Sequence, residues 1–407
     1  MPSHTSRRRF LAAVGAAATA SLAGCVDSAD ELDGDLGDGA PVPDDATTDW
    51  PLPHFDAQAT SYNPNPVGPT EKPTARWNVE GGWPTGRIAV VGDTAYVPLA
   101  ESLRALDTAS GEERWRVGER TDTDTNYGSP QFTSPAVVDD TVYVGTADRR
   151  GLLALDAETG EERWRWVPGD RTDVRTPAVP ADDGVAVGTD DGLVAVLDFE
   201  TGDPIWTFEV FGEVSKLAFP FNSLYVGTTG GEVYNLYDGR GLWRRKLGGS
   251  IEALAVQGSN GVYAGTFGGG VYRLSGGAHT GRTRWRAEDG PTAHGALALA
   301  DGIVVGTDLA RARGLDHRTG EVRWEIAGDF GAPPAASGSV AYLGGEDGVV
   351  AANLDGGVGV GDARFGAKRW SVSVEGTPTT GVSVADGALF FATQGDKNAE
   401  SRIYAME

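Results

Sequence analysis

The sequence has almost no cysteine, very few lysines and no long apolar segment. Its 407 residues include a single cysteine, Cys25, which excludes an intramolecular disulfide bond and a cysteine-bound metal cluster. The 34 lysine and arginine residues are outnumbered by 58 aspartate and glutamate residues. The resulting formal net charge of −24 excludes the electrostatic footprint of a nucleic-acid-binding protein. No apolar run reaches the roughly 20 residues that a membrane-spanning helix needs.

Lysine is scarce even among the basic residues, because 34 − 5 leaves 29 arginines. This balance resembles that of haloarchaeal proteins, whose excess carboxylates keep the surface hydrated in concentrated salt. A self-repelling surface is tolerated there because molar salt shortens the Debye length to about 3 Å. An ordinary acidic extracellular protein is the alternative. The five lysines are Lys72, Lys216, Lys246, Lys368 and Lys397.

Sequence signals for common catalytic sites are also missing. The histidines are His4, His54, His279, His294 and His317, and none lies at metal-ligand spacing from another. We therefore expect no zinc site. No GxSxG nucleophile elbow and no CxxCH haem motif occur, so neither a hydrolase of the elbow type nor a cytochrome is indicated.

Residues 1–24 have the pattern of an export signal. Arg7 and Arg8 precede Phe10 and Leu11, as in a twin-arginine signal, and a short apolar run follows. The run ends at Leu-Ala-Gly-Cys, which resembles a lipobox, so we expect Cys25 to become a lipidated N-terminus. The chain would then be exported and anchored to the outer face of the cytoplasmic membrane. The alternative is an uncleaved anchor in which the cysteine is incidental.

Residues 25–73 are expected to form an acidic flexible tether. Nine carboxylates and no lysine or arginine lie between Asp27 and Asp49, and glycine and proline interrupt any regular pattern. Such a composition favours a solvated spacer over a packed element.

Tryptophan recurs at intervals of 37 to 49 residues from residue 74 onward, which indicates a repeat architecture. The unit from Thr133 to Trp164 contains four short strands separated by turns, so each repeat is expected to be a four-stranded antiparallel meander. The tail from Thr377 to Met406 has only three strands, and Thr74–Val79 supplies the fourth. The sequence therefore predicts an all-β, eight-bladed propeller over residues 74–407, closed by its N-terminal strand. The tryptophans, expected to anchor the packing between blades, are Trp77, Trp115, Trp164, Trp206, Trp243, Trp285, Trp324 and Trp370.

The repeats resemble those of pyrroloquinoline-quinone (PQQ)-type propellers. The resemblance rests on ALDAETGEERW at 154–164, VLDFETGDPIW at 196–206, GLDHRTGEVRW at 314–324 and SPAV at 134–137. That family includes quinone-dependent dehydrogenases, kinase sensor domains and a scaffold lipoprotein of outer-membrane β-barrel assembly, so the fold does not fix the function. The resemblance implies a surface scaffold that binds protein partners without catalysis. The alternative that it implies is a dehydrogenase of alcohols or sugars that uses PQQ and calcium.

Two departures bear on these alternatives. Many dehydrogenases of the family have a ring formed by two adjacent cysteines, which this chain lacks, although some members lack it too. The scaffold lipoprotein works at an outer membrane, which a haloarchaeal cell would not have. Its partner therefore cannot be carried over.

A loop after Trp115 places Asp122, Asp124 and Asn126 at alternate positions, which would suit a calcium ion. Against this, the glycine falls at the seventh loop position rather than the sixth. The twelfth position is Thr133 instead of a bidentate glutamate. A solvated loop is the alternative.

The longest connections are expected on one face of the propeller. In a meander, loops between the second and third strands emerge on the same face as loops that lead to the next blade. Recognition concentrates in such loops. The expected partner contacts are Tyr127, Phe132, Arg149, Arg150 and Arg311.

Overall fold

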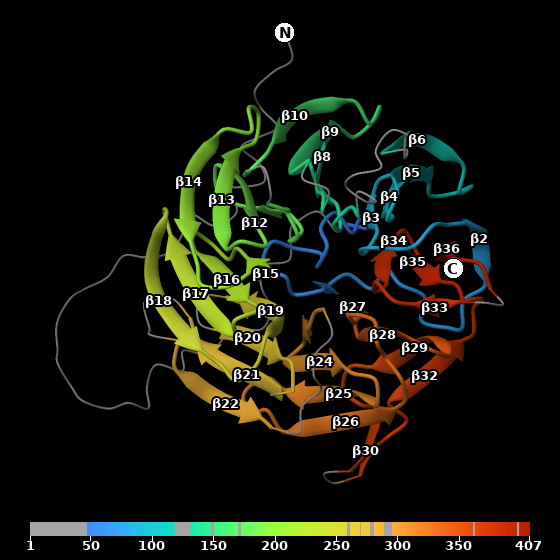
Figure 1. Cartoon of the computed structure of the whole chain (residues 1–407). Coiled ribbons are helices and arrows are strands. Elements are labelled where there is room, and N and C mark those ends of the chain that lie inside the picture. The colour runs from blue at the N-terminus through green and yellow to red at the C-terminus, as the bar shows by residue number, and fades with distance from the viewer. Residues whose placement is uncertain are drawn as a thin grey trace, which may run out of the picture. The chain divides into compact units, whose positions relative to one another are not determined.

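The computed structural model describes residues 47–118, 131–147, 150–169, 172–258, 261–268, 270–276, 281–288, 295–360, 363–396 and 399–407. All regular structure in these ranges is β-strand. The strands lie in one compact unit, Thr48–Glu407, whose sheets are arranged as blades around a centre (Figure 1). No helix in the described ranges is long and apolar enough to cross a membrane.

Each blade is a four-stranded antiparallel sheet, numbered here from its innermost strand outward. Blade 1 contains β3 (Ala89–Val91), β4 (Thr94–Pro98), β5 (Leu103–Asp107) and β6 (Glu113–Val117). Blade 2 contains β7 (Ala136–Val138), β8 (Thr141–Gly145), β9 (Leu152–Asp156) and β10 (Glu162–Trp166). Blade 3 contains β11 (Val179–Pro180), β12 (Gly184–Gly188), β13 (Leu193–Asp198) and β14 (Pro204–Glu209). Blade 4 contains β15 (Val214–Ala218), β16 (Leu224–Thr228), β17 (Glu232–Tyr237) and β18 (Arg240–Lys246).

The second half of the ring repeats this order. Blade 5 contains β19 (Ile251–Gln257), β20 (Gly261–Thr266), β21 (Gly270–Ser275) and β22 (Thr283–Ala287). Blade 6 contains β23 (Ala298–Ala300), β24 (Ile303–Thr307), β25 (Arg311–Asp316) and β26 (Val322–Ala327). Blade 7 contains β27 (Ala335–Ser337), β28 (Val340–Gly345), β29 (Gly348–Asn353) and β32 (Lys368–Val372). The hairpin of β30 (Val358–Val360) and β31 (Ala363–Phe365) is inserted before β32.

Blade 8 is assembled from both ends of this unit. The strands β33 (Thr377–Pro378) and β34 (Ser383–Ala385) both pair with β35 (Ala388–Gln394), which pairs with β36 (Arg402–Met406). The outer strand is β2 (Ala75–Glu80), which lies antiparallel to β36 with Trp77 opposite Ala405. The prediction of an eight-bladed ring closed by its N-terminal strand is confirmed.

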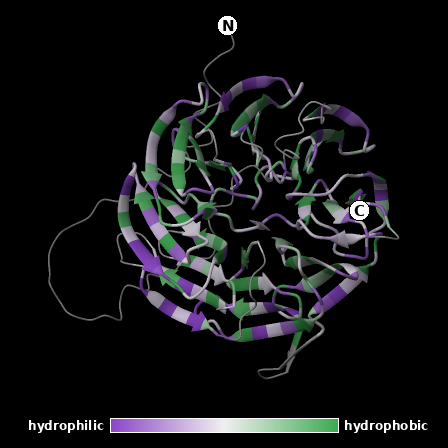
Figure 2. Cartoon of the chain, in the orientation of Figure 1, coloured by the Kyte–Doolittle hydropathy of each residue, from purple (hydrophilic) through white to green (hydrophobic). Residues whose placement is uncertain are grey.

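The position of a strand within a blade decides its residue pattern. All five residues of β8 are buried, because neighbouring blades cover both of its faces. In the outermost strand β10 only Trp164 and Trp166 are half-buried and the other three residues are exposed, since one of its faces meets solvent. Figure 2 shows this change from hydrophobic inner strands to more hydrophilic outer strands.

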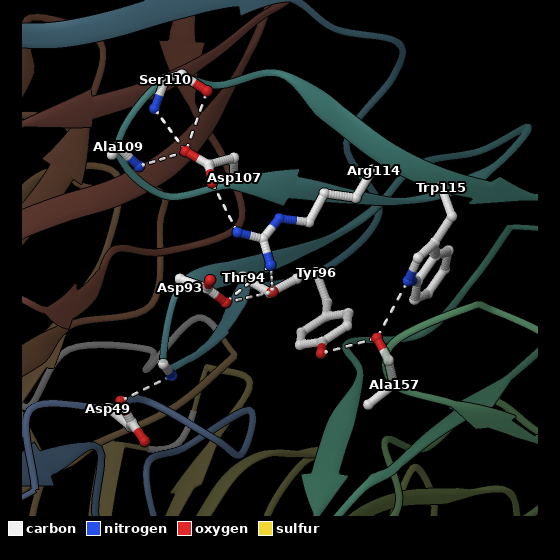
Figure 3. Close-up of polar contacts among 11 residues, drawn as sticks. Asp49, Asp93, Thr94, Tyr96, Asp107, Ala109, Ser110, Arg114, Trp115 and Ala157 are labelled. Atoms are coloured by element: carbon white, nitrogen blue, oxygen red, sulfur yellow. Dashed lines mark hydrogen bonds and ion pairs between the residues drawn. The ribbon is translucent and has the colours of Figure 1, made fainter.

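Outer-strand tryptophans pack against the next blade. The indole Nε1 of Trp115 donates to the carbonyl of Ala157 at 3.1 Å, and the hydroxyl of Tyr96 donates to the same oxygen at 3.2 Å (Figure 3). The indole of Trp370 has no hydrogen-bond acceptor among the described residues. Seven blade junctions, that of Trp115 included, place a tryptophan against a turn glycine of the next blade: Trp77 and Gly111, Trp115 and Gly160, Trp164 and Gly202, Trp206 and Gly239, Trp243 and Gly281, Trp285 and Gly320, and Trp324 and Gly356.

Arginines beside these tryptophans tie two turns of one blade together. Arg114 donates to Asp93 at 2.8 Å and to Asp107 at 2.6 Å (Figure 3). Hydrogen bonds from Arg114 and then from Ser110 lower the pKa of Asp107 to about 2. Arg163 makes the equivalent pairs in blade 2. These exposed pairs fix turn geometry more than they add stability.

Residues 48–63 form a plug inside the ring, which corrects the predicted extent of the tether. Trp50 is fully buried and its backbone pairs with Val90 in blade 1. The segment then follows the inner strands around the ring, and β1 (Tyr62–Asn63) lies parallel to β27 in blade 7. The compact unit therefore begins well before the predicted residue 74. The plug accepts backbone hydrogen bonds from blades 2, 4, 5, 6 and 7, in that order, through the carbonyl oxygens of Pro51, Ala57, Gln58, Thr60 and Ser61.

Candidate functional site

The propeller has two unlike faces. The loop face carries the connections between second and third strands and those that lead to the next blade. The turn face carries the remaining hairpin turns. The plug bonds to inner strands close to the turns that follow them, as at Val137, Leu299 and Ala336. It therefore closes the centre of the ring from the turn face.

A cavity of about 630 Å³ lies above the plug and is lined by loop-face residues. Its floor includes Leu52, Pro53 and Ala59 of the plug. Its walls include Trp83 and Val174, from loops that lead into blades 1 and 3. The lining combines apolar side chains with charged and hydroxyl-bearing ones, and a pocket of this size can hold a small molecule.

Arg87 is buried at the junction of the plug with blades 1 and 7. Its Nη1 donates to the carbonyl of Pro53 at 3.2 Å, and its Nη2 donates to the carbonyls of Pro333 and Pro334, both at 3.0 Å. The guanidinium also lies 5.5 Å from the ring centre of Trp50. No carboxylate pairs with it among the described residues, and burial lowers its pKa to about 9.

Two further basic groups line the cavity. Lys216 on β15 is deep in the molecule, and burial lowers its pKa while Glu252 acts in the opposite direction. The pKa of His54 lies well below its usual value because of burial and the nearby charges of Arg87 and Lys216. His54 is therefore neutral at pH 7, and its Nδ1 lies 3.3 Å from the hydroxyl of Ser61.

Asp56 is the carboxylate of the plug that faces this cavity. Burial raises its pKa to about 6, although hydrogen bonds from the backbone and hydroxyl of Thr60, at 2.9 and 2.7 Å, favour the charged form. Both carboxyl oxygens are used by these two bonds. Asp56 therefore holds a turn of the plug and leaves the cations of the cavity without a direct carboxylate partner.

Large apolar side chains are exposed around the loop face. Phe211 precedes blade 4, Phe267 joins β20 to β21, and Leu309 joins β24 to β25. Trp83 lies at the cavity wall. The exposed fractions are 68% for Phe211, 64% for Phe267, 62% for Leu309 and 58% for Trp83. Exposed apolar groups on a highly charged protein favour recognition of another molecule.

The structure places the predicted partner-contact residues in different environments. Phe132 is 1% exposed and packs beside Gly118, so its predicted role as a surface contact is wrong. The backbone of Phe132 bridges to Thr146, and its ring packs in a buried cluster with Leu103 and Val144. Arg311 lies on the loop face within 4 Å of Asp308 and Glu325, and Arg150 is half-buried there. Tyr127 and Arg149 lie outside the described residues.

Other predicted residues also fall outside the described ranges. These are Arg7, Arg8, Phe10, Leu11 and Cys25 of the export signal, and Asp122, Asp124 and Asn126 of the candidate calcium loop. Within the described ranges, no group of three histidine, cysteine, aspartate or glutamate side chains is placed to hold a metal ion.

The family described as outer membrane protein assembly factor BamB matches residues 67–215 and 190–407. The chain belongs to the BamB family. Among curated proteins, none matches it.

Solved structures confirm the fold of this BamB-family chain. BamB from Moraxella catarrhalis is 21% identical with a TM-score of 0.62, and the match covers 83% of this chain and 98% of that one. Quinohemoprotein alcohol dehydrogenase from Comamonas testosteroni is 15% identical with a TM-score of 0.71, covering 89% and 81%. The computationally designed protein Ika8 is 19% identical with a TM-score of 0.63, covering 80% and 97%. These identities support the fold and leave the function open between a scaffold and an enzyme.

Sequence reasoning missed the cavity and its charges. The plug contains no repeat and directly follows the acidic run, so the sequence alone predicts that it belongs to the flexible tether. One signal was available, because Trp50, Leu52 and Phe55 lie close together directly after Asp49, the last residue of the acidic run. Three large apolar residues in one short stretch indicate burial. Nothing in the sequence indicates that the charges of Arg87 and Lys216 would both act on His54.

Proposed function

We propose that this chain is a non-enzymatic scaffold that docks a protein partner through its loop face. The observation that carries this proposal is the set of exposed apolar side chains, Trp83, Phe211, Phe267 and Leu309, on that face of an acidic molecule. Large apolar and aromatic residues dominate the binding energy of protein interfaces, and charged residues surround them. Arg150 and Arg311 lie on the same face and would contact acidic groups of the partner.

Photo-crosslinking from matched positions on the two faces tests this assignment. A photoreactive phenylalanine analogue would replace Phe267 on the loop face or Phe221 on the turn face, where the exposed fraction is 49%. We expect a crosslinked native partner from position 267 only. Capture from position 221 alone would place the interface on the other face.

We further propose that the chain is exported and anchored by a lipid on Cys25, as an acidic surface protein of a salt-rich environment. The support is the order of Arg7, Arg8, Phe10 and Leu11 before the lipobox-like end of the signal. Cys25→Ser should move the protein from the membrane fraction to the soluble fraction. A variant that stays in the membrane as firmly as the wild type would contradict lipidation.

The alternative is a PQQ-dependent dehydrogenase, favoured by the likeness to a quinohemoprotein alcohol dehydrogenase. The residues present do not fit the calcium ion of such enzymes. The described cavity lining contains the carboxylates Asp56 and Glu213 against the cations Arg87, Arg175 and Lys216. Calcium takes six to eight oxygen ligands, most of them from carboxylates and carbonyls.

A turnover assay distinguishes the two functions. Purified protein would be incubated with PQQ and calcium and then supplied with alcohols or aldose sugars and an artificial electron acceptor. The scaffold proposal predicts no turnover above that of the protein without PQQ. Reproducible turnover would establish the dehydrogenase.

A further inference from the structure

The loop-face cavity contains positive charge that its own residues do not neutralise. The ammonium group of Lys216 makes no hydrogen bond or ion pair with a described residue, and Glu252 acts on it only at longer range. Lys216 lies deep but remains partly exposed, and it lines the cavity. It is thus a buried cation whose accessible side faces the cavity.

A second cation of the cavity lining, Arg87, also lacks a carboxylate partner among the described residues. The Nε of Arg87 is buried and has no hydrogen-bond partner, although the other nitrogens of the guanidinium donate to carbonyls. The hydroxyl of Thr380 is also buried without a partner, and it lines the cavity. A Cβ added at Gly381 would lie 2.8 Å from this Nε, so the chain packs closely against the guanidinium. Because neither orphan atom is open to the cavity, Arg87 would act on a ligand there through its charge and not through a hydrogen bond from Nε.

The carboxylates around the cavity do not supply the missing partner. Both oxygens of Asp56 accept hydrogen bonds from Thr60. Arg175, another cation of the lining, is paired with Asp173 at 3.1 Å. Glu213 lines the cavity, but it is one carboxylate against the two deep cations, Arg87 and Lys216.

We propose that the cavity binds a carboxylate, held by the ammonium group of Lys216 and attracted by the uncompensated charge of Arg87 in the same lining. Ion pairing in a site shielded from bulk water is much stronger than on the surface, and unpaired buried cations are costly. The apolar walls, which include Leu52, Val174 and Leu217, would receive the hydrocarbon part of the ligand. This proposal rests on the charge and lining of the cavity, whereas the protein-docking proposal rests on the exposed apolar side chains of the loop face.

The carboxylate can come from a small organic acid or from an acidic side chain of a bound protein. Isothermal titration with succinate, with benzoate and with an acetylated peptide of alternating aspartate and glycine distinguishes these sources. Binding of either free acid assigns a small-molecule site. Binding of the peptide alone assigns the cavity to an acidic segment of a protein.

Lys216→Met and Lys246→Met form a matched pair for this test. Both replace a lysine of blade 4 with an unbranched apolar side chain, but Lys246 is exposed on β18 and does not line the cavity. We expect Lys216→Met to weaken binding of the bound probe at least tenfold and Lys246→Met to leave it unchanged. Equal affinity in both variants would overturn the proposal. So would the absence of binding of any probe to the wild type at ~10 mM, a concentration at the weak end of ligand affinities.

Thermal melting without ligand provides a second measurement that does not require binding. Lys216→Met removes an unpaired buried cation, so its melting temperature should be at least that of the wild type. Adding the bound probe should raise the melting temperature of the wild type and not that of the variant. A variant that melts lower yet keeps the ligand-induced rise would show that Lys216 does not hold the carboxylate.

Discussion

The ring of Trp115 lies so close to Gly160 of the next blade that a Cβ added there would be 2.7 Å from its Cε3 atom. Gly160 also has a φ of 74°, a backbone conformation that L side chains rarely adopt. The same turn supplies the Ala157 carbonyl that accepts from the indole. One short turn therefore fixes both the packing and the hydrogen bond of this junction, and the pattern recurs around the ring.

Replacing Gly160 with alanine should destabilise the ring more than the same change at Gly92. Gly92 has a φ of 56° but nothing within 4 Å of an added Cβ, so Gly92→Ala measures the backbone cost alone. We expect about 1–2 kcal/mol for Gly92→Ala. Gly160→Ala should lower the free energy of unfolding by about another 1–3 kcal/mol, because the added methyl group overpacks against Trp115. Denaturant unfolding measures both, and equal losses would show that the tryptophan moves aside freely.

The buried carboxyl of Asp56 should make stability fall as the pH rises. Its folded pKa of about 6 exceeds the ordinary 3.8, so the protonated form is favoured in the folded state. That stabilising contribution is complete below pH ~3.8 and is lost as the pH rises through about 6. The side chain of the Asp56→Asn variant stays neutral at every pH. The free energy of unfolding of this variant should therefore rise relative to that of the wild type by up to about 3 kcal/mol between pH ~4 and ~7.

Unfolding of wild type and Asp56→Asn at matched pH values checks this expectation. The comparison between the two proteins cancels the titration of all other groups that the substitution does not affect. Asp107→Asn is a suitable control, because the pKa of Asp107 is lowered to about 2 by Arg114 and its effect must have the opposite sign. A constant difference between wild type and Asp56→Asn over this range would contradict the buried position of the carboxyl.

Two tryptophans near the start of the unit distinguish a packed plug from a tether. Trp50 is fully buried, whereas Trp83 is 58% exposed. Trp50→Ala should cost about 3–5 kcal/mol, as expected for a large core side chain. Trp83→Ala should stay within about 0.5 kcal/mol, typical of surface substitutions. Denaturant unfolding of both variants provides the measurement, and a small loss for Trp50→Ala would favour a loosely attached segment.

Stability should rise with salt. Removal of the signal with Arg7, Arg8 and Arg9 would change the formal net charge from −24 to −24 − 3 = −27. Self-repulsion of this charge weakens as the Debye length falls from about 10 Å at 0.1 M to about 3 Å at 1 M salt. Thermal melting in KCl over this range should show a clear increase in midpoint, with equimolar sucrose as an uncharged control. A midpoint that responds no more to KCl than to sucrose would contradict the halophilic interpretation.

The repeat itself could be predicted from particular residues. Tryptophans at regular spacing and Asp-to-Gly turns such as Asp156–Gly160 are local signals, because a hairpin brings together residues that are close in sequence. The missing fourth strand of the last repeat and the extra strand around Trp77 predicted the closure of the ring. Burial of Phe132 could not be predicted, because a loop residue receives its environment from whichever elements pack around it.

The sequence by itself therefore determined the all-β class, the eight blades and the strand that closes them, since these depend on short-range patterns that repeat. Only the tertiary structure decided where the charges lie. His54, Arg87 and Lys216 come from the plug, from the loop into blade 1 and from blade 4, and they share one environment because the ring closes around the plug. Long-range electrostatics of this kind depends on three-dimensional distance and burial, for which neighbours along the chain carry no signal.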